Sequence, residues 1–121
     1  MVKKILVVED RKVFLKPIKG HFKRRGFKVF TAKNLKAAKA LLASEKFDQV
    51  ITDVFLPRRF WFSPDGLEVA KICKKRGIPV IVHSTIENNR LQRFLHWPVR
   101  RRARRAGVEI LPKRETMKKF R

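Results

Sequence analysis

Residues 3–10 read KKILVVED, a short apolar run that ends in two acids. The apolar part, Lys3–Val8, is continuous and rich in β-branched residues, which is typical of a strand covered on both faces of a sheet. Helix-like patterns separate it from further runs of this kind, so the chain predicts an α/β fold with a parallel sheet and helices on both faces. The other expected strands are Lys28–Thr31, Val50–Asp53, Ile78–His83 and Val108–Leu111, and the expected helices lie at about 12–25, 34–44, 65–76 and 86–95, with a short fifth after Lys113.

Local signals set the expected limits of the helices. Asn34 is a good N-cap for the second helix, and Asp65 is a candidate cap for the third. Pro17 lacks the amide hydrogen that a helix interior uses, so we expect the first helix to kink or to start late.

Length and composition favour one domain and an anionic partner. The chain has 121 residues and 44% hydrophobic content, which suits a single domain over 1–121 with no separate output domain. The formal net charge is +22, from 32 Lys+Arg against 10 Asp+Glu, and favours nucleic acid, acidic protein surfaces or small anions as partners. The first apolar run is too short for a membrane span or a signal peptide, and the single cysteine, expected in the core, indicates a cytoplasmic location.

Acids stand where two of the expected strands end. Glu9 and Asp10 close the first strand and Asp53 closes the third. Ligands of an open parallel sheet bind beyond the carboxyl ends of its strands, and three carboxylates gathered there suit Mg²⁺. Ser84 and Lys113, just past the fourth and fifth strands, would supply the hydrogen bond and the positive charge that a phosphoryl group needs. An acid at a strand end is often only a turn former or cap, but the three acids, Ser84 and Lys113 together, each at the end of its own strand, favour a site.

The chain resembles a response-regulator receiver domain, the flavodoxin-like phosphoacceptor domain of two-component signalling. The motifs that carry the resemblance are KKILVVED at 3–10, GFKVFTA at 26–32, FDQVITDVFLP at 47–57, GIPVIVHST at 77–85 and AGVEILPK at 106–113. It implies a five-stranded sheet in the order 2-1-3-4-5. It also implies a phosphoacceptor role for Asp53, with Mg²⁺ bound by Glu9, Asp10, Asp53 and the backbone carbonyl of Phe55. Ser84 would follow the phosphoryl group and Lys113 would pair with its charge.

The chain departs from this family in two insertions, near 58–65 and 94–105. The first separates Pro57 from Gly66 and would screen the pocket or dock a partner. Ile110 stands where the family usually has an aromatic switch residue. His83 is expected to point from the fourth strand into a flanking layer, and no Cys/His pair has the spacing of a metal site. The candidate anion or partner contacts in the insertions are Arg58, Arg59, Trp61, Arg100, Arg101, Arg102, Arg104 and Arg105.

Two functions remain open at this point. In the first, the chain is a stand-alone receiver that takes a phosphoryl group on Asp53 from a histidine kinase or phosphotransfer protein and signals by contact with a downstream protein. It would not be an enzyme, although it would take part in its own phosphorylation and dephosphorylation. In the second, the receiver-like fold is a basic adaptor that binds nucleic acid or an acidic protein independently of phosphorylation.

Overall fold

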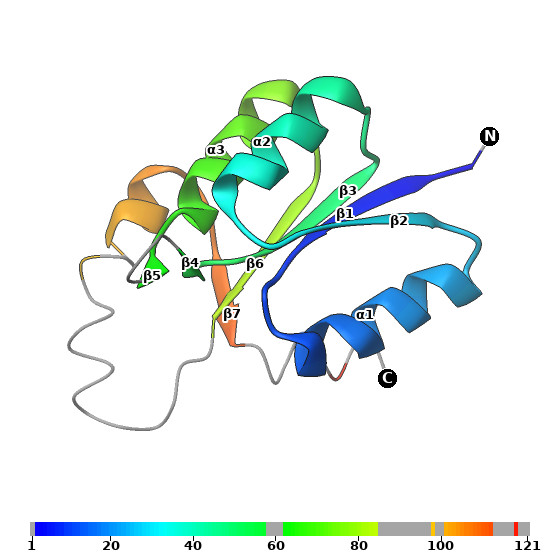
Figure 1. Cartoon of the computed structure of the whole chain (residues 1–121). Coiled ribbons are helices and arrows are strands. Elements are labelled where there is room, and N and C mark those ends of the chain that lie inside the picture. The colour runs from blue at the N-terminus through cyan, green and yellow to red at the C-terminus, as the bar shows by residue number, and fades with distance from the viewer. Residues whose placement is uncertain (1, 58–61, 85–97, 99–100, 113–117, 119–121) are drawn as a thin grey trace.

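Five parallel strands form the centre of the molecule (Figure 1). The computed structural model describes residues 2–57, 62–84, 98, 101–112 and 118. The strand order is β2-β1-β3-β6-β7, which confirms the order 2-1-3-4-5 implied by the resemblance. The strands are β1 (Lys4–Val8), β2 (Lys28–Ala32), β3 (Gln49–Asp53), β6 (Val80–Ser84) and β7 (Ile110–Pro112).

Helices cover both faces of this sheet. The helix α1 (Lys12–Arg24) lies on one face, and α2 (Leu35–Ser44) and α3 (Gly66–Arg76) lie together on the other (Figure 1). Helix α1 runs through Pro17 and begins at Lys12, so the late start expected from the proline does not occur. Asn34 caps α2 as predicted, because its Oδ1 accepts a hydrogen bond of 2.8 Å from the amide of Ala37.

Asp65 does not cap α3 with its side chain. Its backbone is helical, with φ −66° and ψ −19°, whereas a capping residue is normally extended so that its side chain can turn back to the first amides. The amide of Gly66 instead donates to the carbonyl of Val54 at 2.9 Å. The start of α3 is therefore fixed by its contact with the end of β3.

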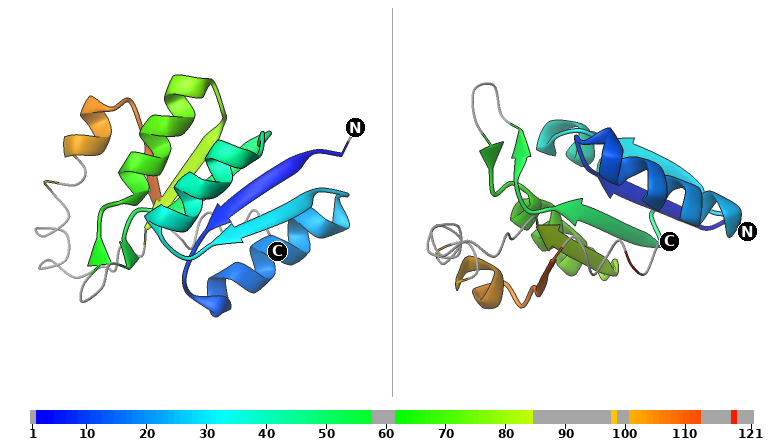
Figure 2. Two further views of the ribbon diagram at one scale, coloured as in Figure 1. Left: turned by 45° about the horizontal axis from the view of Figure 1, so that its top comes forward. Right: turned by 90° about the horizontal axis from the view of Figure 1, so that it is seen from below.

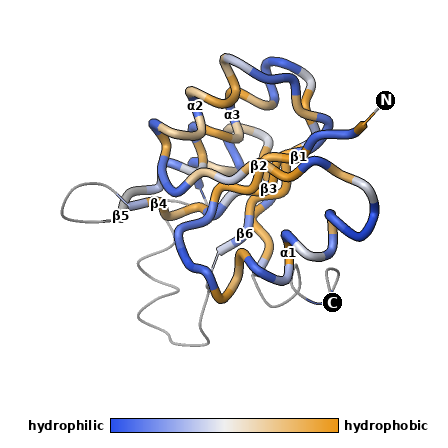
Figure 3. The backbone as a smooth tube through the Cα atoms, turned by 45° about the vertical axis from the view of Figure 1, so that its right-hand side comes forward, coloured by the Kyte–Doolittle hydropathy of each residue, from blue (hydrophilic) through white to orange (hydrophobic). Residues whose placement is uncertain are grey.

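Successive side chains along each strand point to opposite faces of the sheet, so the core is divided into two layers. Ile5, Val7 and Ile51 point to the α1 side, where they pack with Ile18 and Phe22. Their neighbours along the same strands point to α2 and α3, and this side includes Leu6, Val8, Val50 and Cys73. Figure 3 shows the hydrophobic residues concentrated along the strands and the hydrophilic ones on the outer turns of the helices. Burial on both faces is the reason why the strands read as continuous apolar runs.

Two short strands pair at the first insertion. They are β4 (Leu56–Pro57) and β5 (Phe62–Ser63), which pair antiparallel with Leu56 opposite Ser63 and are called the hairpin below. Leu56 is fully buried in the core beside α2 and α3, and it anchors the base of the hairpin. Figure 2 shows the hairpin extending away from the five-stranded sheet. The insertion is thus an appendage on the junction between β3 and α3.

The structure describes residue 98 and residues 101–105 of the second insertion. Residues 101–105 are helical, and Ala103 is buried against Val108 and residues of α3 and β6. The expected helix at 86–95 lies outside the described residues, and so does the expected helix after Lys113 apart from residue 118. No helix in the described part of the chain is long and apolar enough to cross a membrane.

Candidate functional site

Three polar side chains form a row across the carboxyl end of the sheet. Asp53 pairs with His83 in the register of β3 and β6, and Glu9 follows Val8, whose partner in β3 is Thr52. Each of the three comes two residues after an apolar side chain of the α1 layer, namely Val7, Ile51 and Ile81. Since side chains alternate along a strand, Glu9, Asp53 and His83 continue that layer beyond its apolar part.

Glu9, Asp10 and Asp53 form a compact carboxylate cluster, as the sequence predicts. Each offers one ligand atom, and these atoms all lie within 4.8 Å of one another. Glu9 is only 1% exposed and Asp53 only 6%, whereas Asp10 is half-buried. Burying acids this close together is costly unless a cation shares them. The oxygen donors therefore fit a hard divalent cation such as Mg²⁺.

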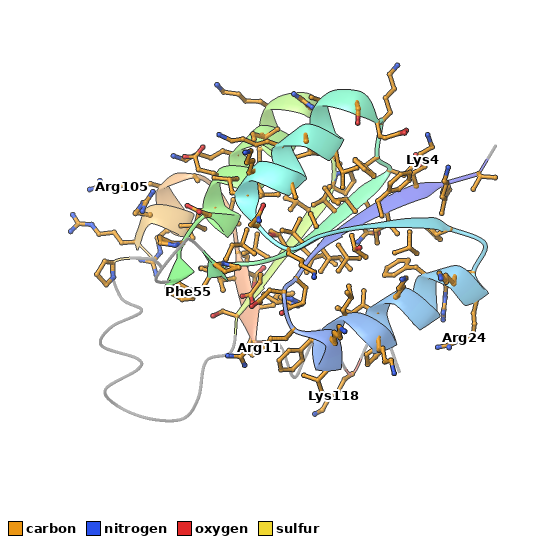
Figure 4. The ribbon with its side chains drawn as sticks, viewed as in Figure 1. Lys4, Arg11, Arg24, Phe55, Arg105 and Lys118 are labelled. Carbon is orange, nitrogen blue, oxygen red and sulfur yellow. The ribbon has the colours of Figure 1, made fainter. Side chains whose placement is uncertain are left out.

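Backbone groups hold two of these carboxylates. The amide of Phe55 donates to Oδ1 of Asp53 at 3.3 Å, and the amide of Arg11 donates to Oε1 of Glu9 at 3.2 Å. The amide of Glu9 donates to the carbonyl of Ala32 at 2.9 Å, which ties the end of β1 to β2. Figure 4 places Arg11 and Phe55 at the carboxyl end of the sheet and Lys4 at the opposite end. The backbone thus fixes the acids before any ligand binds.

Ser84 ends β6 beside this cluster. It is 1% exposed, and its Oγ has no hydrogen-bond partner among the residues that the structure describes. A buried hydroxyl without a partner is costly, so such a group commonly serves a ligand. Ser84 is thus where the sequence predicts it, at the end of the strand next to Asp53.

The other expected site residues divide into two groups. Lys113, Arg58, Arg59, Trp61 and Arg100 lie outside the described residues, so their predicted roles stay predictions. Four arginines of the short helix at 101–105 are exposed, and Figure 4 shows Arg105 on its outer side. They are Arg101, Arg102, Arg104 and Arg105.

Sequence reasoning missed the environment of His83. Its side chain is fully buried, and Nε2 lies 3.4 Å from Oε2 of Glu9. The prediction that His83 faces a flanking layer agrees with this burial, but it did not include a contact with the acids. The sequence signal for this contact was that His83 comes two residues after Ile81 and so faces the same layer. Because His83 pairs with Asp53 in the strand register, it then lies close to the acids.

Gly66 is the second residue whose importance the sequence did not reveal. A Cβ at this position would lie 1.8 Å from the carbonyl oxygen of Asp53. Because no other side chain fits there, Gly66 allows α3 to start directly against the backbone of the central acid. The insertion that precedes it leaves this contact intact.

A doubly wound α/β sheet with an acidic cluster at its carboxyl edge is the architecture of a receiver domain. Comparison with known families agrees: residues 5–96 match the response regulator receiver domain. Since this match spans most of the 121 residues, the chain belongs to the response regulator receiver domain family.

Solved structures share the fold at low sequence identity. A CheY-like response regulator receiver domain protein from Methanospirillum hungatei is 20% identical, with 98% of this chain and 90% of that chain covered and a TM-score of 0.68. A Burkholderia pseudomallei response regulator, solved with a phosphorylated aspartic acid, calcium ion and citrate, is 22% identical, with coverage of 91% and 58% and a TM-score of 0.66. A co-crystal structure from Saccharomyces cerevisiae contains a histidine phosphotransfer signaling protein and the receiver domain of its downstream response regulator. Its identity is 21%, its coverage 98% and 86%, and its TM-score 0.62.

Proposed function

We propose that the chain accepts a phosphoryl group on Asp53 from a histidine kinase or a phosphotransfer protein. The observation that carries this proposal is the position of Asp53, 6% exposed at the end of the central strand and grouped with Glu9 and Asp10. Membership of the receiver family supports the choice of donor. So does the similarity to a receiver crystallised with a histidine phosphotransfer protein.

Asp53 is the group that reacts. One carboxylate oxygen forms a bond to phosphorus while the bond from phosphorus to the donor's imidazole nitrogen breaks, and the imidazole leaves with the electron pair. Because the amide of Phe55 holds Oδ1 at 3.3 Å, the carboxylate has a fixed orientation for this attack. Hydrolysis of the acyl phosphate by water later restores Asp53. The chain turns over no separate substrate, so we class it as a phosphoacceptor rather than an enzyme.

The surrounding residues provide charge and hydrogen bonds. Glu9, Asp10, Asp53 and the carbonyl of Phe55 would hold Mg²⁺, which when bound neutralises the oxygens of the transferring group. The hydroxyl of Ser84 would donate to a phosphoryl oxygen, and Lys113 would pair with its charge. Phosphorylation replaces the single negative charge of the Asp53 carboxylate with up to two negative charges on the acyl phosphate at the carboxyl edge of the sheet. A change at that edge is the means by which the chain would signal, through contact with a downstream protein.

A labelling experiment tests the phosphoacceptor role. The chain is incubated with acetyl phosphate and Mg²⁺, and the mass increase of one phosphoryl group is measured by intact-protein mass spectrometry. We expect labelling of the unchanged chain and of Asp48→Asn, but none of Asp53→Asn or of a sample treated with EDTA. Asp48 is the matched control because it is an exposed aspartate near the amino end of β3, where Oδ2 accepts a hydrogen bond of 2.7 Å from the amide of Lys4. Labelling of Asp53→Asn would refute the assignment.

The four exposed arginines of the 101–105 helix favour a second candidate function, the binding of nucleic acid or of an acidic protein. Arginine contacts phosphate through two parallel hydrogen bonds, and exposed clusters attract polyanions. This function would not require Asp53. Binding of a DNA or RNA fragment that falls steeply with salt and is unchanged in Asp53→Asn would support it.

A further inference from the structure

His83 occupies a position where the fold requires only an apolar side chain. Its predecessor on the same face, Ile81, packs in the apolar α1 layer, and His83 itself is 0% exposed. An imidazole carries two nitrogens that need partners, so placing it in a dry core costs free energy unless those nitrogens are used. The position therefore calls for an explanation beyond packing.

Neither ring nitrogen is hydrogen-bonded within the described part of the chain. Nε2 faces Oε2 of Glu9 at 3.4 Å, with both side chains fully buried. This approach lacks the alignment of a hydrogen bond. The nitrogen is nevertheless directed at an acid of the carboxylate cluster.

The separation of these two atoms matches that of two donors on one metal ion. Bonds of about 2.1 Å from a metal to nitrogen and to oxygen, meeting near the tetrahedral angle, separate the two donor atoms by about 3.4 Å. Glu9 also lies within 4.8 Å of the ligand atoms of Asp10 and Asp53, so an ion beside it would be within reach of more oxygen donors. His83 is not one of the three residues of that group, so Glu9 is the ligand that would join the imidazole to the other carboxylates.

We propose that the pocket is a mixed carboxylate–imidazole metal site, in which His83 Nε2 and Glu9 ligate a first-row transition ion of the Co²⁺ or Zn²⁺ type. Imidazole is a good ligand for these ions, whereas Mg²⁺ prefers oxygen alone. His83 would therefore raise the affinity for transition ions relative to Mg²⁺. The inference rests on the cation pocket of the proposed function, but it concerns the identity of the ion and not the transfer of a phosphoryl group.

The experiment uses the whole chain without a histidine tag and measures two quantities. Calorimetric titrations with Co²⁺ and with Mg²⁺ give the ratio of the two dissociation constants. Pulsed electron paramagnetic resonance of bound Mn²⁺ detects the ¹⁴N nucleus of a coordinated imidazole. We expect ¹⁴N modulation in the unchanged chain. We also expect the preference for Co²⁺ over Mg²⁺ to fall about tenfold or more in His83→Leu, because that variant loses its nitrogen donor.

The remaining histidines give a matched control. The chain has 3 histidines, so His21→Leu combined with His96→Leu leaves His83 as the only imidazole. This variant must keep both the ¹⁴N modulation and the Co²⁺ preference. It also keeps the test decisive if His83→Leu folds poorly, because its own signal is a positive result.

Two other outcomes would overturn the inference. The first is Mn²⁺ bound by the unchanged chain without ¹⁴N modulation, and the second is an equal Co²⁺ preference in the unchanged chain and His83→Leu. If Asp53 is still labelled in a Mg²⁺-dependent reaction, only the role of His83 fails. If none of these ions binds and Asp53 is not labelled, the proposed function fails as well.

Discussion

Gly66 lies so close to Asp53 that a Cβ on the glycine would stand 1.8 Å from the aspartate's carbonyl oxygen. The same carbon would stand 2.8 Å from Cα of Val54. These are backbone atoms of the strand end that carries the acidic cluster, so they cannot move aside as a flexible side chain can. Gly66 therefore couples the start of α3 to the geometry of the site.

The first prediction concerns this contact. We expect Gly66→Ala to lower the free energy of unfolding by about 3 kcal/mol, since the new methyl group must displace either α3 or the end of β3. The same displacement should reduce labelling of Asp53 by acetyl phosphate. Urea denaturation followed by circular dichroism measures the first effect, and mass spectrometry measures the second.

Gly20→Ala is the control for this substitution. Gly20 lies within α1, and a Cβ there would meet only the guanidinium of Arg24, at 3.1 Å from its nearest nitrogen. That end of the side chain can swing away, so alanine should stabilise the helix by about 0.5–1 kcal/mol. Equal destabilisation by the two substitutions would contradict a specific contact at Gly66.

The second prediction separates stability from function at Ser84. Since its Oγ is buried without a hydrogen-bond partner among the described residues, Ser84→Ala should leave the stability unchanged or raise it by up to about 1 kcal/mol. The same change should slow labelling of Asp53 about tenfold, because a hydrogen bond to the phosphoryl group is lost. Opposite signs in the two measurements distinguish a ligand-directed hydroxyl from a structural one.

Ser44→Ala provides the comparison for Ser84. Ser44 ends α2, is exposed, and donates only a long bond of 3.4 Å to the carbonyl of Leu41. It should change neither the labelling rate nor the stability beyond about 0.5 kcal/mol. A Ser84→Ala variant that labels as fast as Ser44→Ala would exclude the hydroxyl from phosphoryl transfer.

The sequence predicts the sheet and the carboxylate cluster because both depend on local patterns. A strand buried on both faces must be apolar throughout, and Ile5 to Val8 satisfy this requirement without reference to the rest of the chain. Acids that end parallel strands must then meet at one edge, so the grouping of Glu9, Asp10 and Asp53 follows from the topology. The strand order itself came from the resemblance and not from periodicity.

What the sequence could not predict depends on contacts between distant segments. The approach of His83 to Glu9 requires the register of three strands and two particular side-chain rotamers, and neither is encoded near either residue. The failure of Asp65 to cap α3 follows from the tight fit of Gly66 on β3, which sets the entry angle of the helix. The pairing of β4 with β5 is not predictable from the sequence, because each strand is only two residues long.

The third prediction concerns the thiol of Cys73. The side chain is fully buried between α3 and the sheet, and this burial raises its pKa from the usual 9.0 to about 11. The thiol is therefore protonated in the folded chain at pH 8, and its preference for the neutral form begins to cost stability only as the pH rises through 9 towards 11. Ellman's reagent at pH 8 should react at least about 100-fold more slowly with the folded chain than with the chain in urea, since the reagent needs an exposed thiolate. Rapid reaction of the folded chain would contradict this burial.

The fourth prediction concerns the arginines of the 101–105 helix. Ala103 is 2% exposed and attaches the helix to the core. The exposed arginines of this helix can therefore be replaced without loss of packing. Glutamine at these four positions should weaken binding of a short DNA duplex. It should also reduce the slope of log affinity against log salt by about 0.9 for each phosphate contact that is lost. The four positions are Arg101, Arg102, Arg104 and Arg105.

The control removes the same number of charges from another face. Helix α1 lies on the opposite side of the sheet from α3 and carries four lysines. Replacing these four lysines with glutamine gives a variant with the same net charge as the arginine variant. If the 101–105 helix is a binding surface, the arginine variant loses more affinity and more slope than the lysine variant. Equal losses would mean that DNA responds only to the net charge of +22, and the helix would then have no specific part in binding. The four lysines are Lys12, Lys16, Lys19 and Lys23.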